Sequence, residues 1–228
     1  AVVGHLFTGM ALRALVLTLQ TTLAATLICV VFGTPLAYML ARNDFRGRGV
    51  IDTLVDLPIT IPPVVAGVAL LLAFGRRGLL GQHLDAAGIQ IPFTTIAVVM
   101  AQVFIASPFY VRTVRAGFAT VDRTLEAVAG TLGASPWRVF WTISVPLARP
   151  AIVAGIVLAW ARALSEFGAT MMFAGNLPGR TQTLTLAVMS AMESDLDTAV
   201  SISILSLILA GAALFAAKRF VRARGISV

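Results

Sequence analysis

The sequence is poor in the residues that build disulfides, metal sites and nucleotide sites. Its 228 residues include one cysteine, Cys29, and two histidines, His5 and His83. A single cysteine excludes an intrachain disulfide, and neither histidine has a second metal ligand near it at helical spacing. The only lysine, Lys218, follows an alanine, so the Gly-Lys pair of a phosphate-binding P-loop is missing. We therefore expect no bound metal or cofactor in this chain.

Charge is also scarce, and long apolar runs take its place. Only 12% of the residues are charged, 58% are hydrophobic, and the mean hydropathy is +0.93. A membrane-spanning helix needs roughly 20 apolar residues. Uncharged runs of about this length or more cover residues 14–41, 57–75, 86–111 and 198–217. One more span, the fourth in chain order, is expected at about Leu147–Glu166. The sequence predicts an all-α integral membrane protein of about five transmembrane helices, with residues 1–228 forming one domain.

Basic residues are distributed unequally between the two sides of these spans. Twelve fall on one side and four on the other, the four being Arg13, Arg76, Arg77 and Arg180. The positive-inside rule then places the N-terminus outside and the C-terminus inside. The cytoplasmic parts would be residues 42–53, residues 113–146 and the tail from Lys218. The net charge of +7 is therefore a topology signal, and too little polar chain remains to build a nucleic-acid surface.

The longest predicted cytoplasmic segment, 113–146, carries two helix-start signals. Asp122 is a good N-cap for a helix over Arg123–Leu132, and Gly133 is suited to end it. Ser135 caps a second helix over residues 136–143, with a proline at its first position. Two short helices joined at a Gly-Ala-Ser turn predict a compact knob.

An aromatic stripe is expected on the second of these helices. Trp137, Phe140 and Trp141 are spaced i, i+3 and i+4, with Arg138 beside them. Two interpretations remain open at this point. The stripe is either a docking surface for a partner or an anchor in the membrane interface, where tryptophan is favoured.

The segment resembles the cytoplasmic EAA signature of ABC importer permeases. With Gly133 at the signature glycine, Ile143 and Pro146 fall where the pattern requires them. The Glu-Ala-Ala positions fall on 127–129, so Glu126 stands one residue early. The resemblance implies contacts to an ATPase from Glu126, Ala129, Gly133, Ala134, Ser135, Pro136, Trp137, Arg138, Phe140 and Trp141.

Two further regions resemble the molybdate/tungstate branch of these permeases. Residues 57–67 followed by 74–78 are similar to its second span, and residues 166–170 followed by 175–183 are similar to the segment after its fourth span. The sulfate permeases have similar patterns, so the oxyanion stays open. An ATP-independent secondary transporter or channel and a membrane-embedded enzyme are the competitors from other classes.

The resemblance implies a type I ABC importer permease fold in the plasma (inner) membrane of a prokaryote. It also implies the partners: a second copy of the chain, two cytoplasmic ATPase subunits that bind ATP and magnesium, and an outside substrate-binding protein. Transport would proceed by alternating access.

The candidates for the translocation pathway combine helix breakers with intramembrane polar groups. Three prolines interrupt the second span and free backbone groups, while an Arg and a Glu four residues apart can pair on one helix face. A static kink and a structural ion pair are the alternatives. The candidates are Pro58, Pro62, Pro63, Arg162, Glu166 and Thr170.

Two smaller features complete the expectations for the spans. Residues 181–192 are too short to span and fit a short outer or re-entrant helix. Small residues, including Gly33, Gly67 and Gly155, are expected to let helices approach closely.

Overall fold

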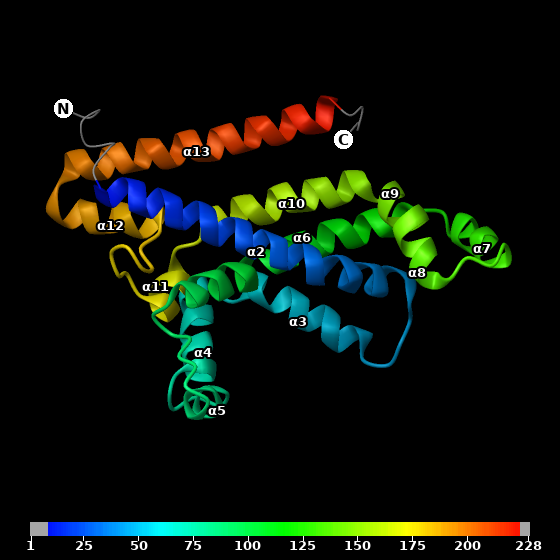
Figure 1. Ribbon diagram of the computed structural model, residues 1–228, viewed down its shortest axis with the longest axis horizontal. Helices are drawn as coiled ribbons and strands as arrows, with labels where there is room; N and C mark the ends of the chain where they lie inside the picture. The colour runs from blue at the N-terminus through cyan, green and yellow to red at the C-terminus, as the bar shows by residue number, and fades with distance from the viewer. Residues whose placement is uncertain (1–8, 224–228) are drawn as a thin grey trace.

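The computed structural model describes residues 9–223, and every regular element in that range is a helix (Figure 1). This confirms the all-α prediction; His5 lies outside the described residues. In chain order the elements are α2 (Gly9–Arg42), α3 (Arg48–Thr60), α4 (Pro63–Phe74), α5 (Gly81–Ala86), α6 (Thr95–Thr120), α7 (Arg123–Thr131), α8 (Pro136–Val139), the π-helix η1 (Phe140–Ser144), α9 (Val145–Leu147), α10 (Arg149–Leu164), α11 (Gly168–Ala174), α12 (Leu184–Ser194) and α13 (Leu196–Ala223).

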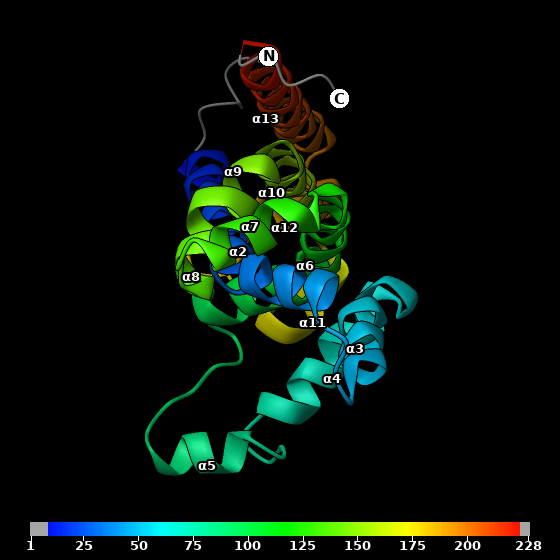
Figure 2. The ribbon, with the colours of Figure 1, turned by 90° about the vertical axis from the view of Figure 1, so that its right-hand side faces the viewer.

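Helices α2, α6 and α10 pack together at the centre (Figures 1 and 2). The hydroxyls of Thr18, Thr22 and Thr26 each donate to a backbone carbonyl four residues earlier on α2, at 2.7 Å. The Thr22 hydroxyl also accepts from the indole of Trp160 on α10 at 3.0 Å, and that of Thr18 accepts from the backbone N–H of Leu184 at 2.9 Å. Polar groups in an apolar bundle are thus satisfied within the chain.

The predicted close approach of helices at glycine is found around Tyr110. A Cβ on Gly33 would lie 2.7 Å from Cδ1 of Tyr110, and one on Gly155 would lie 3.2 Å from its Cδ2. The ring of Tyr110 therefore fits between α2 and α10 because each helix has a glycine there, with a hydrogen where other residues have a Cβ. Its hydroxyl is 2.6 Å from the hydroxyl of Thr34.

The second predicted span, 57–75, is two helices. Ile61 is extended, Pro62 precedes α4, and Pro63 is its first residue, so the chain breaks at this pair of prolines. Pro58 lies inside α3 and does not interrupt it, which corrects its expected part in the break. The 12 residues of α4 rise only about 18 Å, too short to cross a bilayer. In Figure 1, α4 runs across the direction of α2 and α6, and Figure 2 shows α4 and α5 projecting from the bundle.

The third predicted span is displaced along the sequence. It was expected at 86–111, whereas α6 covers Thr95–Thr120. Gly88 and Pro92 lie in the non-helical stretch before it, and the side chain of Thr94 caps its first turn by accepting from the N–H of Ala97 at 3.4 Å. The helix then continues through 113–120, residues that were predicted to belong to the cytoplasmic segment.

Helix α6 continues past Arg112 and Arg115, two good helix formers, and both pair with carboxylates of α3. Arg112 lies 2.7 Å from a carboxylate oxygen of Asp56, and Arg115 lies 2.5 Å from one of Asp52. Both ion pairs are partly exposed to solvent. They hold α3 alongside the last turns of α6.

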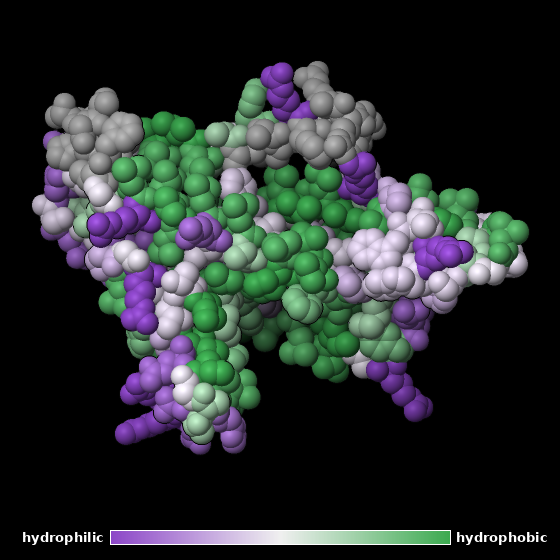
Figure 3. Space-filling model, viewed as in Figure 1, coloured by the Kyte–Doolittle hydropathy of each residue, from purple (hydrophilic) through white to green (hydrophobic). Residues whose placement is uncertain are grey.

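By length and hydropathy, two described helices could each cross a membrane alone, α2 and α6, and α8 to α10 would add a third as a pair bent by 73°. The described apolar part of α13, 196–212, is shorter, and so is α12, which confirms the predicted short helix near 181–192. The first, third, fourth and fifth predicted spans thus correspond to α2, α6, α10 and α13. Apolar side chains cover the middle of the face in Figure 3, and hydrophilic ones gather toward its margins.

The contact between α4 and α11 should be sensitive to a single methyl group. A Cβ on Gly67 would lie 2.7 Å from the carbonyl oxygen and 2.8 Å from Cα of Ala169, which are backbone atoms that cannot rotate away. We expect Gly67→Ala to cost about 1–3 kcal/mol and to lower the thermal unfolding midpoint of the purified protein in detergent. Gly211→Ala is the control, because a Cβ there meets nothing within 4 Å. Equal midpoints for both variants would contradict the packing described.

Candidate functional site

The knob predicted in the 113–146 segment is formed by α7 and α8, and its caps are those expected. The Asp122 carboxylate accepts from the N–H of Thr124 at 2.8 Å at the start of α7. Hydrogen bonds from the backbone and hydroxyl of Thr124 hold the pKa of Asp122 below its usual range. The hydroxyl of Ser135 accepts from the N–H of Arg138 at 3.3 Å and caps α8. Both helix starts predicted from the sequence are confirmed.

The turn between the two helices depends on the backbone conformation of Gly133. Its φ is +84°, a left-handed value that glycine adopts without steric cost. Its N–H donates to the carbonyl of Gly130, and the N–H of Ala134 donates to that of Ala129, both at 3.0 Å. This pair of bonds is the Schellman helix end. A Cβ on Gly133 would meet nothing within 4 Å, so the backbone angle is the constraint, and space is not.

The aromatic stripe is only partly exposed. Trp137 and Trp141 are 68% and 50% exposed, and Arg138 between them is exposed as well. Phe140 is only 5% exposed, and its ring packs on Tyr38 at a centroid distance of 4.9 Å. Phe140 therefore faces the bundle, which corrects its predicted place on the exposed stripe. The surface that remains is the two tryptophans with Arg138.

A π-helix covers the second part of this segment. The predicted helix over 136–143 is α8 followed by η1, in which the N–H of Val145 donates to the carbonyl of Phe140 five residues earlier. Phe140 and Ser144, four residues apart, are both buried, while Trp137 and Trp141 face out. The sequence contains no cue that we could use to predict η1.

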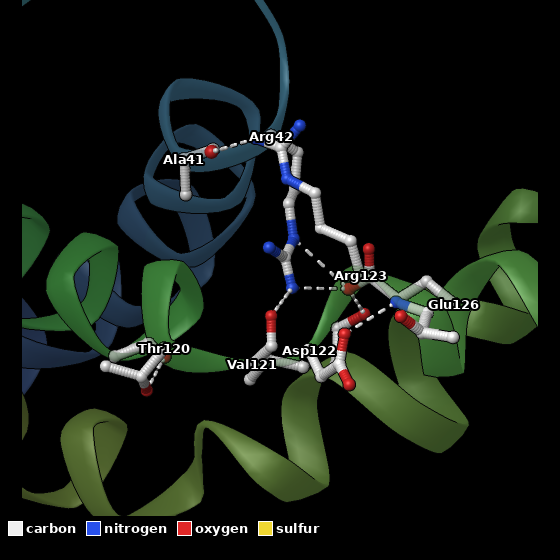
Figure 4. A network of polar contacts seen from close by, with 10 residues as sticks. Ala41, Arg42, Thr120, Val121, Asp122, Arg123 and Glu126 are labelled. Atoms are coloured by element: carbon white, nitrogen blue, oxygen red, sulfur yellow. Dashed lines mark hydrogen bonds and ion pairs between the residues drawn. The ribbon is translucent and has the colours of Figure 1, made fainter.

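Glu126 is engaged within the chain. Its Oε1 accepts from Nη2 and Nε of Arg42 at 2.9 and 3.2 Å (Figure 4). The same oxygen accepts from the hydroxyl of Ser144 at 2.6 Å. The side chains of Glu126 and Arg42 are 15% and 7% exposed. Sequence reasoning assigned Glu126 to a contact with another protein and missed Arg42 and Ser144. Arg42 was counted only as a charge that ends the first span.

Three of the pathway candidates meet at the junction of α10 and α11. Nη2 of Arg162 lies 3.3 Å from Oε2 of Glu166, an ion pair without a hydrogen bond to that oxygen. Oε1 of Glu166 accepts from the N–H of Ala169 at 2.7 Å and caps α11. Thr170 is fully buried, and its hydroxyl has no hydrogen-bond partner among the described residues. The ion pair that the structural interpretation predicts is present, and the part of Arg162, Glu166 and Thr170 in the pathway stays a prediction.

The proline candidates lie against the same junction. A Cβ on Gly168, the first residue of α11, would lie 3.2 Å from Cβ of Pro63 at the start of α4. The proline break and the Arg162–Glu166 pair are thus joined through the contact of α4 with α11. Pro58 lies before the break, buried within α3.

Comparison with known proteins identifies the family of this chain. The family described as "Binding-protein-dependent transport system inner membrane component" matches residues 33–225. The chain belongs to this family. The permease is 47% identical over 199 residues to the molybdenum transport system permease protein ModB of Mycobacterium bovis, a match that covers 86% of the permease and 75% of ModB.

Two further comparisons bear on its substrate class and fold. The permease is 38% identical over 183 residues to a probable sulfate transport system permease protein of Chlorokybus atmophyticus, covering 80% of the permease and 64% of that protein. Its fold matches a chain of a bacterial alginate ABC transporter crystallised with a substrate-bound periplasmic protein. That match has a TM-score of 0.79 at 17% identity and covers 99% of the permease and 83% of the other chain.

These matches confirm the class that the EAA signature predicts. The permease is a multi-pass inner-membrane subunit of an ABC importer, with the fold of the transmembrane subunits of such transporters. At 17% identity the structural match concerns the fold alone.

The ion pair at the α10–α11 junction can be tested by removing one charge and then both. Arg162→Ala leaves Glu166, 1% exposed, without a counter-charge, and we expect a loss of stability of about 3 kcal/mol, the lower end for buried pairs because Arg162 is partly solvated. Arg162→Ala/Glu166→Gln should recover most of it, since the amide oxygen can still cap α11. Thermal unfolding in detergent measures both variants, and uptake per assembled complex should stay normal. Reduced uptake by a stable Arg162→Ala protein would instead show that Arg162 acts in the translocation pathway.

Proposed function

We propose that this permease carries a tetrahedral oxyanion, molybdate or tungstate, into the cytoplasm, driven by ATP hydrolysis in a separate subunit. The observation that carries the coupling to ATP is the exposed surface formed by Trp137 and Arg138 of α8 and Trp141 of η1. It lies on a knob whose two helix starts are capped and whose turn is a Schellman end. The sequence of the permease contains no P-loop, the motif that would bind ATP. The likeness to a molybdenum permease supports the choice of oxyanion.

The exposed tryptophans suit a protein partner. Tryptophan and arginine are enriched among the residues that dominate protein–protein binding energy. The knob also holds its shape without help from a partner, because both its helix starts are capped by side chains and the turn is a Schellman end. A pre-formed surface loses less conformational entropy on binding. These features support residues 121–146 as the ATPase-coupling part of the predicted 113–146 segment.

The partners follow from what one chain lacks. ATP and magnesium would be bound by two cytoplasmic ATPase subunits. Few of the described helices are long and apolar enough to cross a membrane, too few for one chain to enclose a pathway. A second copy related by a two-fold axis would complete it. A substrate-binding protein would deliver the oxyanion on the outer side, with the N-terminus outside and the C-terminus inside.

Transport would use alternating access. ATP-driven closure of the two ATPases would bring the two coupling segments together and turn the bundles so that the pathway opens outward. Hydrolysis would separate the ATPases and reopen the pathway toward the cytoplasm. The pathway would pass the α4–α11 region, where Pro62 and Pro63 interrupt the helix and the buried hydroxyl of Thr170 lacks a partner.

Competition for uptake identifies the oxyanion. Cells carrying the complete transporter would be given radiolabelled molybdate with an excess of unlabelled tungstate or sulfate. We expect tungstate to suppress uptake of the label and sulfate to leave it almost unchanged. Suppression by sulfate at equal concentration would assign the permease to sulfate, the runner-up. Uptake by the permease reconstituted without any ATPase would instead show an ATP-independent transporter.

The tryptophan surface predicts the effect of a single substitution on assembly. Trp137→Asp replaces an exposed aromatic anchor, which the ATPase would cover, with a carboxylate that would need desolvation on binding. We expect it to weaken ATPase binding by about 2 kcal/mol or more, the range of a hot-spot residue. Co-purification of the ATPase with the tagged permease measures this loss. Leu79→Asp is the matched control, because Leu79 is also highly exposed but lies between α4 and α5, far along the chain from α8. Normal co-purification and normal coupled uptake with Trp137→Asp would rule out this docking surface.

A further inference from the structure

Three segments far apart in the sequence meet in two layers beside the knob. Tyr38 and Arg42 are four residues apart on α2, and Phe140 and Ser144 are four residues apart on η1. Residues that are four apart lie on the same face of a helix. One layer is therefore aromatic and the other is polar, and the layers are one helical turn from each other.

The polar layer converges on one oxygen atom. Oε1 of Glu126 accepts three hydrogen bonds, two from the Arg42 guanidinium and one from the Ser144 hydroxyl. Nη2 of Arg42 also donates to the carbonyl of Val121 at 2.9 Å, at the end of α6 (Figure 4). The layer thus joins the end of α2, the end of α6, α7 and η1. Its charges cancel, since one guanidinium meets one carboxylate.

The aromatic layer joins the same helices by packing. Tyr38 of α2 contacts Phe118 of α6 edge-on at a centroid distance of 5.2 Å and Phe140 of η1 at 4.9 Å. Phe118 and Phe140 are 6.2 Å apart. Edge-to-face ring pairs at these distances are attractive and directional. The aromatic layer fixes η1 on the bundle, but it includes no residue of α7.

Helix α7 depends on the polar layer for its attachment to the bundle. None of its residues is fully buried, and Leu125 and Val128 are 48% and 52% exposed, so apolar packing holds it only weakly. Glu126 ties it to Arg42 and Ser144, and the guanidinium of Arg123 reaches the carbonyl of Ala41 at 3.4 Å. A displacement of α7 relative to α2 must therefore stretch or break the bonds of the Glu126 carboxylate.

We propose that Arg42, Glu126 and Ser144 are positioning residues that transmit movement of the knob to the end of α2 and to the start of the α9–α10 helical segment. The proposal rests on the proposed function, in which the knob is moved by an ATPase. Glu126 acts as the joint inside the permease and leaves ATPase contact to the exposed side chains of Trp137, Arg138 and Trp141 on α8 and η1. Loss of the joint uncouples ATP hydrolysis from transport while the docking surface stays intact.

The test is the number of oxyanions transported for each ATP hydrolysed. The complete complex, in proteoliposomes with its binding protein, is given radiolabelled molybdate, and phosphate release is measured in parallel. Glu126→Gln keeps the side-chain shape but leaves Arg42 without a counter-charge. Arg42→Lys keeps the charge but loses the fork that reaches both Glu126 and Val121. Both variants should retain the ATPase and lower this ratio by about fivefold or more, the lower end of typical coupling between sites.

A milder variant and a matched control make the result specific. Ser144→Ala removes one of the three bonds to the same oxygen and should lower the ratio by a smaller factor. Asp44→Asn removes an ion pair with Arg48 that is exposed and does not involve the knob, and its ratio should match the wild type.

The outcomes separate this proposal from the proposed function. A wild-type permease that binds no ATPase would overturn the proposed function. A functional wild type with unchanged ratios in Glu126→Gln and Arg42→Lys would overturn the joint alone. Loss of ATPase binding in both Glu126→Gln and Ser144→Ala would also overturn it, because the network would then serve only to build the docking surface.

Discussion

Much of the structure depends on one constraint: a polar group enclosed by apolar helices is costly unless it finds a partner inside the chain. Apolar surroundings offer no water to replace a missing hydrogen bond, so an unpaired group is costly there. On α2 the threonine hydroxyls meet this constraint through their own backbone, and two of them also bind α10 and the start of α12. These bonds add to the close packing at Tyr110 in fixing which residues of the helices face each other.

The two most enclosed glutamates apply the same rule at the ends of helices. Glu166 pairs with Arg162 and caps α11, and Glu126 pairs with Arg42 and holds η1. In each case an arginine neutralises the carboxylate while one of its oxygens anchors the next element. The chain contains ten acidic residues against seventeen basic ones. It uses these two acids where the direction of the chain changes.

Much of the fold could be predicted from the sequence, because hydropathy and helix caps are local signals. The first and last apolar helices, the caps Asp122 and Ser135, and the turn at Gly133 all follow from residues close to them. The start of α6 was predicted wrongly, because absence of charge does not distinguish a helix from the loop before it. Past its predicted end, α6 carries Arg112, whose partner Asp56 is 56 residues away and could not be assigned from neighbouring residues. The joint at Glu126 was missed for the same reason, since Arg42 is 84 residues away.

The π-helix η1 separates the orientation of the exposed tryptophan surface from the orientation of the buried helix faces that follow it. A π-turn takes in one more residue than an α-turn, so the chain after it is rotated relative to the chain before it while the backbone ladder continues. The chain then bends by a further 73° between α9 and α10, so the outward direction of Trp137 is separate from the inward direction of the buried α10 residues. If the surface of another ATPase required Trp137 to point in a different direction, a change in η1 would supply it. The packing of the bundle would stay the same.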